Sequence, residues 1–235
     1  EPILLDTRAK IRSYLQNIDP NGHNKGTTLH HTWSPTAAQW HGRASMLNEY
    51  SYFVNTKGWS HLACQFWSAP EGVWTARPFS YQNGAHAYVQ VGRSNANWSQ
   101  VPEPCRSFCN GNRQALNYFT MGCETVGNFD VDDPKTHPSM KWSIELFAAY
   151  HQIFNIPLER QFFHRFVEDK TCPGTKVSHD WFVGELSKLI NGVVDINAVR
   201  IFGIDGNEIP AKARLEDDGR THGIVAEVIK GCKDQ

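Results

Sequence analysis

One short segment, residues 164–174, contains two of the side-chain types that bind zinc best. Seven residues separate His164 from Cys172, and a loop of that length can turn back and present both side chains to one ion. Pro173 and Gly174 end the segment sharply and fix the direction of Cys172. Imidazole and thiolate are common ligands of tetrahedral zinc. The alternative for this segment alone is a core histidine beside a buried cysteine.

Two adjacent histidines, His30 and His31, lie in the expected strand 27–33. Side chains alternate between the faces of a strand, so only one of the two can join a given site. His31 shares its face with Leu29 and Trp33, which is the more core-like set. We therefore predict that His30 is a metal ligand and that His31 is a packed, hydrogen-bonded side chain.

The predicted ligand set is thus His30, His164 and Cys172, with one zinc ion per chain. Three protein ligands leave the fourth tetrahedral position open for water, as in catalytic zinc sites. Zinc lowers the pKa of bound water and polarises a carbonyl, which suits amide hydrolysis. In an extended stretch, Lys170 would point the same way as Cys172, so its ammonium group would lie beside the metal.

The elements that must position these residues mix helices and strands, so the expected fold class is α/β with a mixed sheet. Apolar spacing predicts helices over 4–18, 36–54, 138–154 and 179–189, and strands over 27–33, 62–68, 73–76, 118–126 and 161–166. After residue 192 the pattern changes to short strands over 199–204, 208–215 and 224–229. We expect a main domain of residues 1–192 and a small β-rich appendage of residues 193–235, whose role the sequence does not assign.

Composition excludes some classes of function. The net charge of −1 over 235 residues provides no basic field for nucleic acid or anionic lipid. No apolar run is long enough to span a bilayer, and the first ten residues lack the apolar core of a signal peptide. The presence of six cysteines does not establish disulfides. Cys105 and Cys109 are close in sequence, and they could either form a disulfide or remain free thiols.

Five motifs follow one another along the chain: Leu29-His30-His31-Thr32, Gly58-Trp59 with the segment 66–78, Gly84-Ala85-His86-Ala87, residues 122–129 ending in Gly127-Asn128-Phe129, and His164 with residues 170–174. Together, and in this order, they resemble the zinc amidases shared by bacteriophage lysins, bacterial N-acetylmuramoyl-L-alanine amidases and animal peptidoglycan recognition proteins. The resemblance runs from about residue 27 to residue 190.

The resemblance implies a central mixed sheet flanked by helices, with zinc at the bottom of an open groove. It also implies cleavage of the amide bond between N-acetylmuramic acid and L-alanine in peptidoglycan. Lys170 matches the family's catalytic lysine and would stabilise the oxyanion. Glu124 matches the strand position where some bacterial members place a catalytic carboxylate, which could act as general base toward zinc-bound water.

Two further residues are predicted to bind substrate. His86 should line the groove and be accessible, because it lies between two small alanines. Trp33 is one of several tryptophans that suit stacking on sugar faces, although aromatic side chains are more often core.

One departure from the family pattern concerns Cys64, which stands where many catalytic members carry a tyrosine. A thiol cannot replace a phenol as an oriented donor. Either Glu124 or another group has then taken that role, or activity is reduced.

The sequence therefore predicts a cell-wall lytic enzyme, an endolysin or autolysin, whose partner is peptidoglycan or a muropeptide. It would reach the bacterial wall by secretion or by release from a phage, and no signal peptide is visible in this chain. The alternatives are a non-catalytic peptidoglycan-binding protein and a toxin or recycling amidase that acts on wall fragments. The presence of Cys172 favours an enzyme, because family members that only bind usually lack this ligand.

Overall fold

A computed structural model of the chain describes residues 2–80, 85–90 and 97–191, together with four short strands within 201–228. The chain forms two units, Glu1–Ile190 and Asn191–Gln235. Gly84, which belongs to one of the motifs above, lies outside the described residues, as does Cys232.

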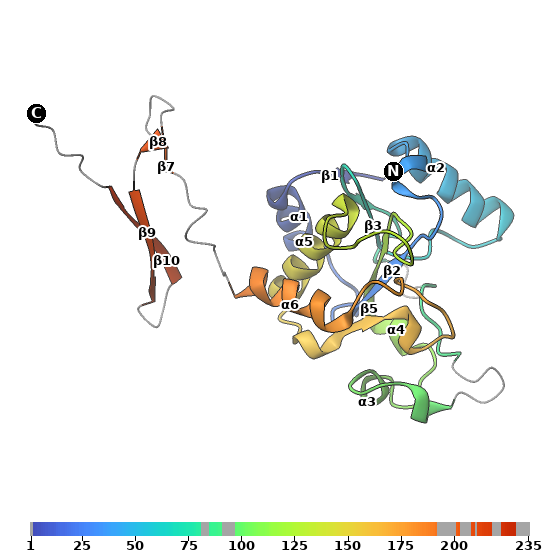
Figure 1. The fold of residues 1–235 in the computed structure, drawn as a ribbon. Coiled ribbons are helices and arrows are strands. Elements are labelled where there is room, and N and C mark those ends of the chain that lie inside the picture. Colours follow the sequence, from blue (N-terminus) through green and yellow to red (C-terminus); the bar gives the residue numbers. More distant parts are fainter. Residues whose placement is uncertain are drawn as a thin grey trace, which may run out of the picture. The chain divides into compact units, whose positions relative to one another are not determined.

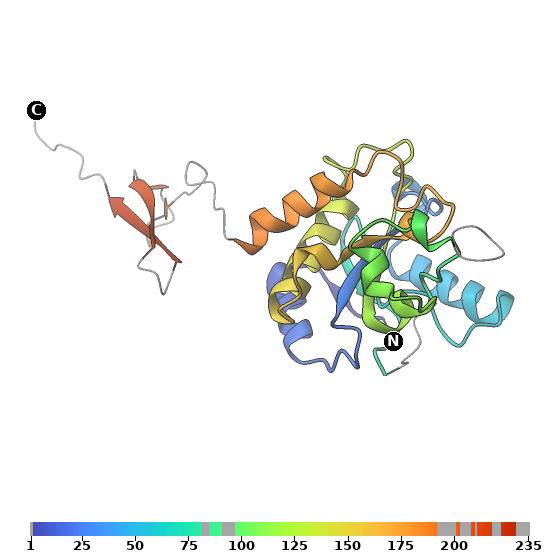
Figure 2. The same ribbon diagram turned by 90° about the horizontal axis from the view of Figure 1, so that it is seen from below.

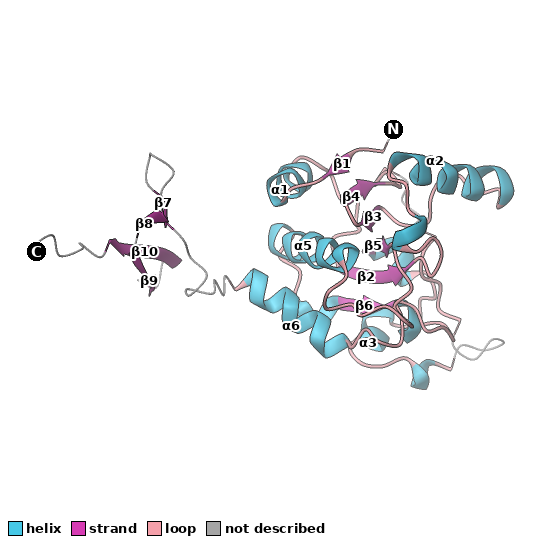
Figure 3. Ribbon diagram, turned by 45° about the horizontal axis from the view of Figure 1, so that its top comes forward, coloured by secondary structure: helices cyan, strands magenta, loops and turns pink. Residues whose placement is uncertain are grey.

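The first unit is built on a six-stranded mixed sheet with the strand order β1-β4-β3-β5-β2-β6. Figure 3 shows the strands in this order, from β1 at the top to β6 at the bottom. Strand β2 pairs in parallel with both β5 and β6, and β3 pairs in parallel with β5, whereas β4 is antiparallel to β1 and β3. The strands are β1 (Leu4–Leu5), β2 (Gly26–His31), β3 (Phe66–Ala69), β4 (Gly72–Thr75), β5 (Thr120–Thr125) and β6 (Gln161–Phe163).

The described residues form six α-helices around the sheet: α1 (Arg8–Gln16), α2 (Arg43–Ser51), α3 (Cys105–Cys109), α4 (Ala115–Phe119), α5 (Pro138–Ile153) and α6 (His179–Ile190). Helix α5 packs on β3, β4 and β5 and lies between α1 and α6, so these three helices cover one face (Figure 1). The view from below in Figure 2 shows α6, in orange, beside α5, in yellow. This is the mixed α/β architecture that the sequence predicts. None of the described helices combines the length and apolar character that a bilayer crossing requires.

Alternation of side chains along β2 and β5 separates a face of the sheet that packs in the core from a face that carries the predicted site residues. Leu29 and Cys123 are register partners on β2 and β5, and both lie in the main hydrophobic cluster with Phe147 and Tyr150 of α5. The next residues along, His30 and Glu124, are also register partners. They therefore share the opposite face of the sheet, away from α5.

Several predicted elements have different boundaries in the structure. The expected helix 4–18 begins only at Arg8, because Leu4 and Leu5 pair with β4 and the Thr7 side chain caps the helix at Lys10 N. The expected helix 36–54 is interrupted at Gly42, which has a φ of 58°, and divides into the 3₁₀ turn Ala37–Gln39, α2 and a π-helical turn, Tyr52–Thr56. The expected strand 118–126 starts inside helix α4.

The loop regions contain further 3₁₀ turns at Trp98–Gln100, Leu158–Arg160 and His164–Phe166. The last of these shortens the predicted strand 161–166, because β6 ends at Phe163. Cys105 and Cys109, at the two ends of α3, are buried free thiols.

The second unit contains two antiparallel pairs, β7 (Ile201–Phe202) with β8 (Glu208–Ile209) and β9 (Ala211–Asp217) with β10 (His222–Val228). Residues 203–207, between β7 and β8, lie outside the described residues.

Candidate metal centre and its groove

The carboxyl ends of two neighbouring parallel strands, β2 and β6, bring the predicted ligands together. His30 is the penultimate residue of β2, and His164 directly follows β6, the neighbour of β2. Cys172 reaches the same point from the loop after β6, and its sulfur accepts a hydrogen bond from the backbone N–H of His31 at 3.4 Å. All three predicted ligands are buried.

The three donor atoms have the spacing of a metal site. His30 Nδ1 lies 3.0 Å from His164 Nδ1 and 3.7 Å from Cys172 Sγ, and all three atoms lie within 4.8 Å of one another. In tetrahedral zinc with its usual bond lengths, two nitrogens lie about 3.3 Å apart, and a nitrogen and a sulfur about 3.6 Å apart. The donor set and its spacing therefore fit zinc.

The protonation states of the two imidazoles also suit a cation. Burial lowers the pKa of His30 well below its usual value, and the neighbouring His164 and His86 lower it further. Burial likewise lowers the pKa of His164. Both rings are therefore neutral near pH 7, so each has a nitrogen lone pair to offer. Burial raises the pKa of the Cys172 thiol, so a metal must displace its proton.

Glu168 supports this centre, although the sequence analysis did not identify it. Its Oε2 lies 2.6 Å from His164 Nε2 and 3.0 Å from Lys170 Nζ. The hydrogen bond to His164, followed by the contact with Lys170, lowers the pKa of Glu168 to about 2. A carboxylate on the outer nitrogen of a ligand histidine fixes its tautomer and ring orientation, so that the inner nitrogen faces the metal. Its position four residues after His164 was the available signal.

Lys170 lies beside the centre, but not for the reason given by the sequence. The segment is not extended: it turns at Lys170, whose backbone N–H donates to Glu168 O. Lys170, Thr171 and Cys172 nevertheless line one hollow of ≈ 410 Å³ together with His30 and His164. The half-exposed ammonium group is held by Glu168, and this contact places it at the edge of the hollow.

Glu124 faces the same space from β5 and also lines the adjoining main groove, a hollow of ≈ 540 Å³ whose walls include Trp59, Tyr88 and Tyr118. Burial raises the pKa of Glu124 to about 8, against smaller opposing effects of Cys64 and Lys170. A cation bound nearby would lower this pKa again. Glu124 is thus a carboxyl group that can exchange a proton near neutral pH.

His86 is more deeply placed than predicted. It lines the main groove but is only 5% exposed, so the expectation of an accessible ring is wrong. Its Nδ1 lies 3.1 Å from His30 Nε2, and its ring rests against Gly122, where an added Cβ would lie 2.8 Å from the ring. The ring fits here because Gly122 has no side chain.

Trp33 and Cys64 occupy the edge and the interior of the site. Trp33 has a φ of 57° and is 61% exposed, and it lines the smaller hollow beside His31. His31 stacks on Phe129 and accepts a hydrogen bond from its backbone N–H at 3.2 Å. Cys64 is fully buried, with its sulfur 3.8 Å from Glu124 Oε1.

Comparison with known proteins identifies a related family. The model of the N-acetylmuramoyl-L-alanine amidase family matches residues 20–175, which include every predicted ligand. No curated protein sequence matches the chain.

Similar solved structures include the Drosophila peptidoglycan recognition protein PGRP-LB, with 20% identity over 75% of this chain and 90% of that chain and a TM-score of 0.48. The amidase LysC from Clostridium intestinale URNW is 19% identical over 72% of this chain and 89% of that chain, with a TM-score of 0.47. A third is peptidoglycan recognition protein-LE in complex with tracheal cytotoxin. It is 18% identical over 67% of this chain and 78% of that chain, with a TM-score of 0.47.

The contact between Glu168 and His164 generates a prediction about metal affinity. Glu168→Gln should weaken zinc binding about 10- to 100-fold, because the neutral amide holds the His164 ring less firmly and adds no negative charge. Competition with a chromophoric chelator measures the affinity directly. Glu185→Gln is the matched control, since Glu185 pairs with Lys188 on the surface of α6. Equal zinc affinity in wild type and Glu168→Gln would remove Glu168 from the support of the centre.

Proposed function

The chain belongs to the N-acetylmuramoyl-L-alanine amidase family, and we propose that it is a zinc-dependent enzyme that cleaves the amide bond between N-acetylmuramic acid and L-alanine in peptidoglycan. The observation that carries the proposal is the convergence of His30, His164 and Cys172 at zinc-ligand spacing. This centre opens onto a groove that also contains an ionisable carboxyl group and an ammonium group.

His30 Nδ1, His164 Nδ1 and Cys172 Sγ would hold the ion, and the chain's hydrogen bonds prepare these donors. Glu168 Oε2 lies 2.6 Å from His164 Nε2, and the His31 backbone N–H donates to Cys172 Sγ, which favours the thiolate. When bound, zinc would supply Lewis-acid chemistry that polarises the amide carbonyl and makes water more nucleophilic at neutral pH.

Glu124 is the proposed proton carrier. Its carboxylate would accept a proton from the attacking water and then deliver it to the leaving amine of L-alanine, as a general base and then a general acid. A carboxyl group in a buried position beside a cation has a pKa set by two opposing effects, and this balance keeps it able to do both near neutral pH.

Lys170 is the proposed stabiliser of the negative charge that develops on the carbonyl oxygen. Its ammonium group lies at the edge of the smaller hollow, held 3.0 Å from Glu168. A positioned cation at that point lowers the energy of the tetrahedral intermediate. The long aromatic side chains of the main groove, Trp59, Tyr88 and Tyr118, and Trp33 at the edge, would contact the sugar and stem peptide.

The proposed partner is therefore peptidoglycan or a soluble muropeptide, and the proposed biological role is lysis of the bacterial wall as an endolysin or autolysin. A non-catalytic binding protein is the second candidate, because the buried thiol of Cys64 stands where many catalytic relatives have a tyrosine. The two candidates differ in whether the bound substrate is cut.

Mass spectrometry of purified peptidoglycan treated with zinc-loaded protein tests the activity. The proposal predicts stem peptides with a free L-alanine amino terminus and glycan strands with free lactyl carboxylates. Cys172→Ser is the control, because it removes a ligand and should produce neither fragment. Wild-type protein that binds peptidoglycan but leaves this bond intact would establish the non-catalytic alternative.

A second prediction separates Glu124 from its neighbour Cys64. Glu124→Gln preserves shape but removes the basic oxygen, so it should lower turnover about a hundredfold or more. Cys64→Ser should cost much less, since the thiol is assigned no proton transfer. Both variants should be compared at one zinc per chain on the same muropeptide. If Cys64→Ser is the impaired variant and Glu124→Gln is nearly normal, the proton carrier has been assigned wrongly.

A further inference from the structure

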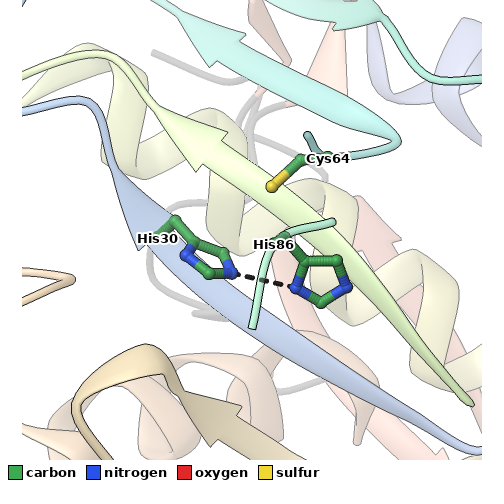
Figure 4. A group of neighbouring side chains, drawn as sticks. All are labelled: His30, Cys64 and His86. Carbon is green, nitrogen blue, oxygen red and sulfur yellow. Dashed lines mark hydrogen bonds between the residues drawn. The ribbon is translucent and has the colours of Figure 1, made fainter. Parts of the chain in front are cut away.

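The two ring nitrogens of His30 face two different sets of donor atoms. Nδ1 is directed to His164 and Cys172, the first donor set described above. Nε2 is directed to His86, and Figure 4 shows the two rings joined by this contact, with the sulfur of Cys64 pointing toward them.

His30, Cys64 and His86 form a second donor set. His30 Nε2 lies 3.1 Å from His86 Nδ1, and one ligand atom of each of the three residues lies within 4.8 Å of those of the other two. The nitrogen pair is again close to the separation of about 3.3 Å between two ligands of tetrahedral zinc. All three residues are buried.

Glu124 adds an oxygen beside this set. Its Oε1 lies 3.8 Å from Cys64 Sγ, while its Oε2 is buried and has no hydrogen-bond partner within the described part of the chain. A hydrogen bond between His30 and His86 would account for the two nitrogens that face each other but not for this oxygen. Buried polar atoms are seldom left without compensation, and a cation would supply it.

We propose that His30 Nε2, Cys64 Sγ and His86 Nδ1 bind a second divalent ion of the zinc class, with the Glu124 carboxylate as fourth donor. His30 then bridges two ions through its two nitrogens. Binding releases to solvent the proton of the His30 Nε2–H group, the proton of the Cys64 thiol and any proton on the Glu124 carboxyl, and no oxidation or reduction takes place. Two nitrogens, one sulfur and one carboxylate oxygen match the ligand preferences of zinc.

The second donor set should fill only after the first. Cys172 accepts a backbone hydrogen bond that favours its thiolate, whereas Cys64 faces a carboxylate, which opposes a second negative charge. In addition, His30 must lose a further proton to act as a bridge. The second ion therefore binds when the metal is in excess over the chain.

Occupancy of the second set has a consequence that depends on the function proposed above. If Glu124 is a ligand of the second ion, it cannot accept a proton from water. Excess zinc should therefore inhibit the proposed amidase activity. This inhibition would require Cys64 as a ligand of the second ion, at the position where the family has a tyrosine.

Cobalt titration of the metal-free full chain tests the second site, because cobalt replaces zinc and each bound thiolate adds charge-transfer absorption. The wild type should bind two ions, and the thiolate absorption should increase again with the second. Cys64→Ser should bind one ion and lose the second increase. Cys109→Ser is the matched control: it also removes a buried thiol, in α3, and should still bind two.

Three outcomes would overturn the proposal. The wild type could bind only one ion in excess cobalt, Cys64→Ser could retain the second increase in thiolate absorption, or Cys109→Ser rather than Cys64→Ser could lose that increase. His86→Gln provides a second variant that should bind one ion if Cys64→Ser does not fold. These readings need no catalysis, so they hold even if the protein does not cleave peptidoglycan. In an active preparation, excess zinc should inhibit the wild type several-fold more than Cys64→Ser, each relative to its own rate at one zinc per chain.

Discussion

Two neutral imidazole nitrogens held 3.0 Å apart, His30 Nδ1 and His164 Nδ1, set the constraint around which the site is organised. Two lone pairs this close repel one another unless a proton or a metal ion lies between them. Burial keeps both rings neutral, as the lowered pKa of each histidine indicates. Glu168 Oε2, 2.6 Å from His164 Nε2, favours a proton on that outer nitrogen rather than between the two rings. The nearby sulfur of Cys172 completes a set of three donors, and a metal ion satisfies all of them at once.

The sheet makes this arrangement rigid. His30 and His164 are placed by β2 and β6, which pair in parallel, so the distance between the two rings is fixed by the ladder of hydrogen bonds. The loop with Cys172 is closed against the body of the protein at Gly174, where a Cβ would lie 2.5 Å from the backbone of Phe129. Gly174 also has a φ of 114°, a conformation that favours glycine. The loop can approach this closely because residue 174 has no side chain.

The features of the site that depend on neighbouring residues along the chain could be predicted from the sequence. Strand alternation separated His30 from His31, and the short spacing from His164 to Cys172 indicated a shared ion. Contacts between distant segments were not predictable in the same way. The His30–His86 contact spans 56 positions, and it depends on the absent side chain of Gly122 on a third segment.

The same limit explains the errors. The prediction for Lys170 assumes an extended chain, whereas a turn over residues 168–170 brings it to the site. Glu168 is not singled out by the sequence, because its proposed role depends on its contact with the outer nitrogen of His164. The prediction of one helix over 36–54 did not take account of Gly42, whose positive φ interrupts the helix.

X-ray absorption spectroscopy at the zinc edge, on protein loaded with one zinc per chain, tests the central claim most directly. Wild type and Cys64→Ser should both show one sulfur at about 2.3 Å and two imidazole nitrogens at about 2.0 Å. In the Cys64→Ser background, the further change Cys172→Ser should remove the sulfur at that distance. Retention of the sulfur in Cys172→Ser together with its loss in Cys64→Ser would mean that the ion prefers the other side of His30. That result would contradict the assignment of His30, His164 and Cys172 as the primary metal centre.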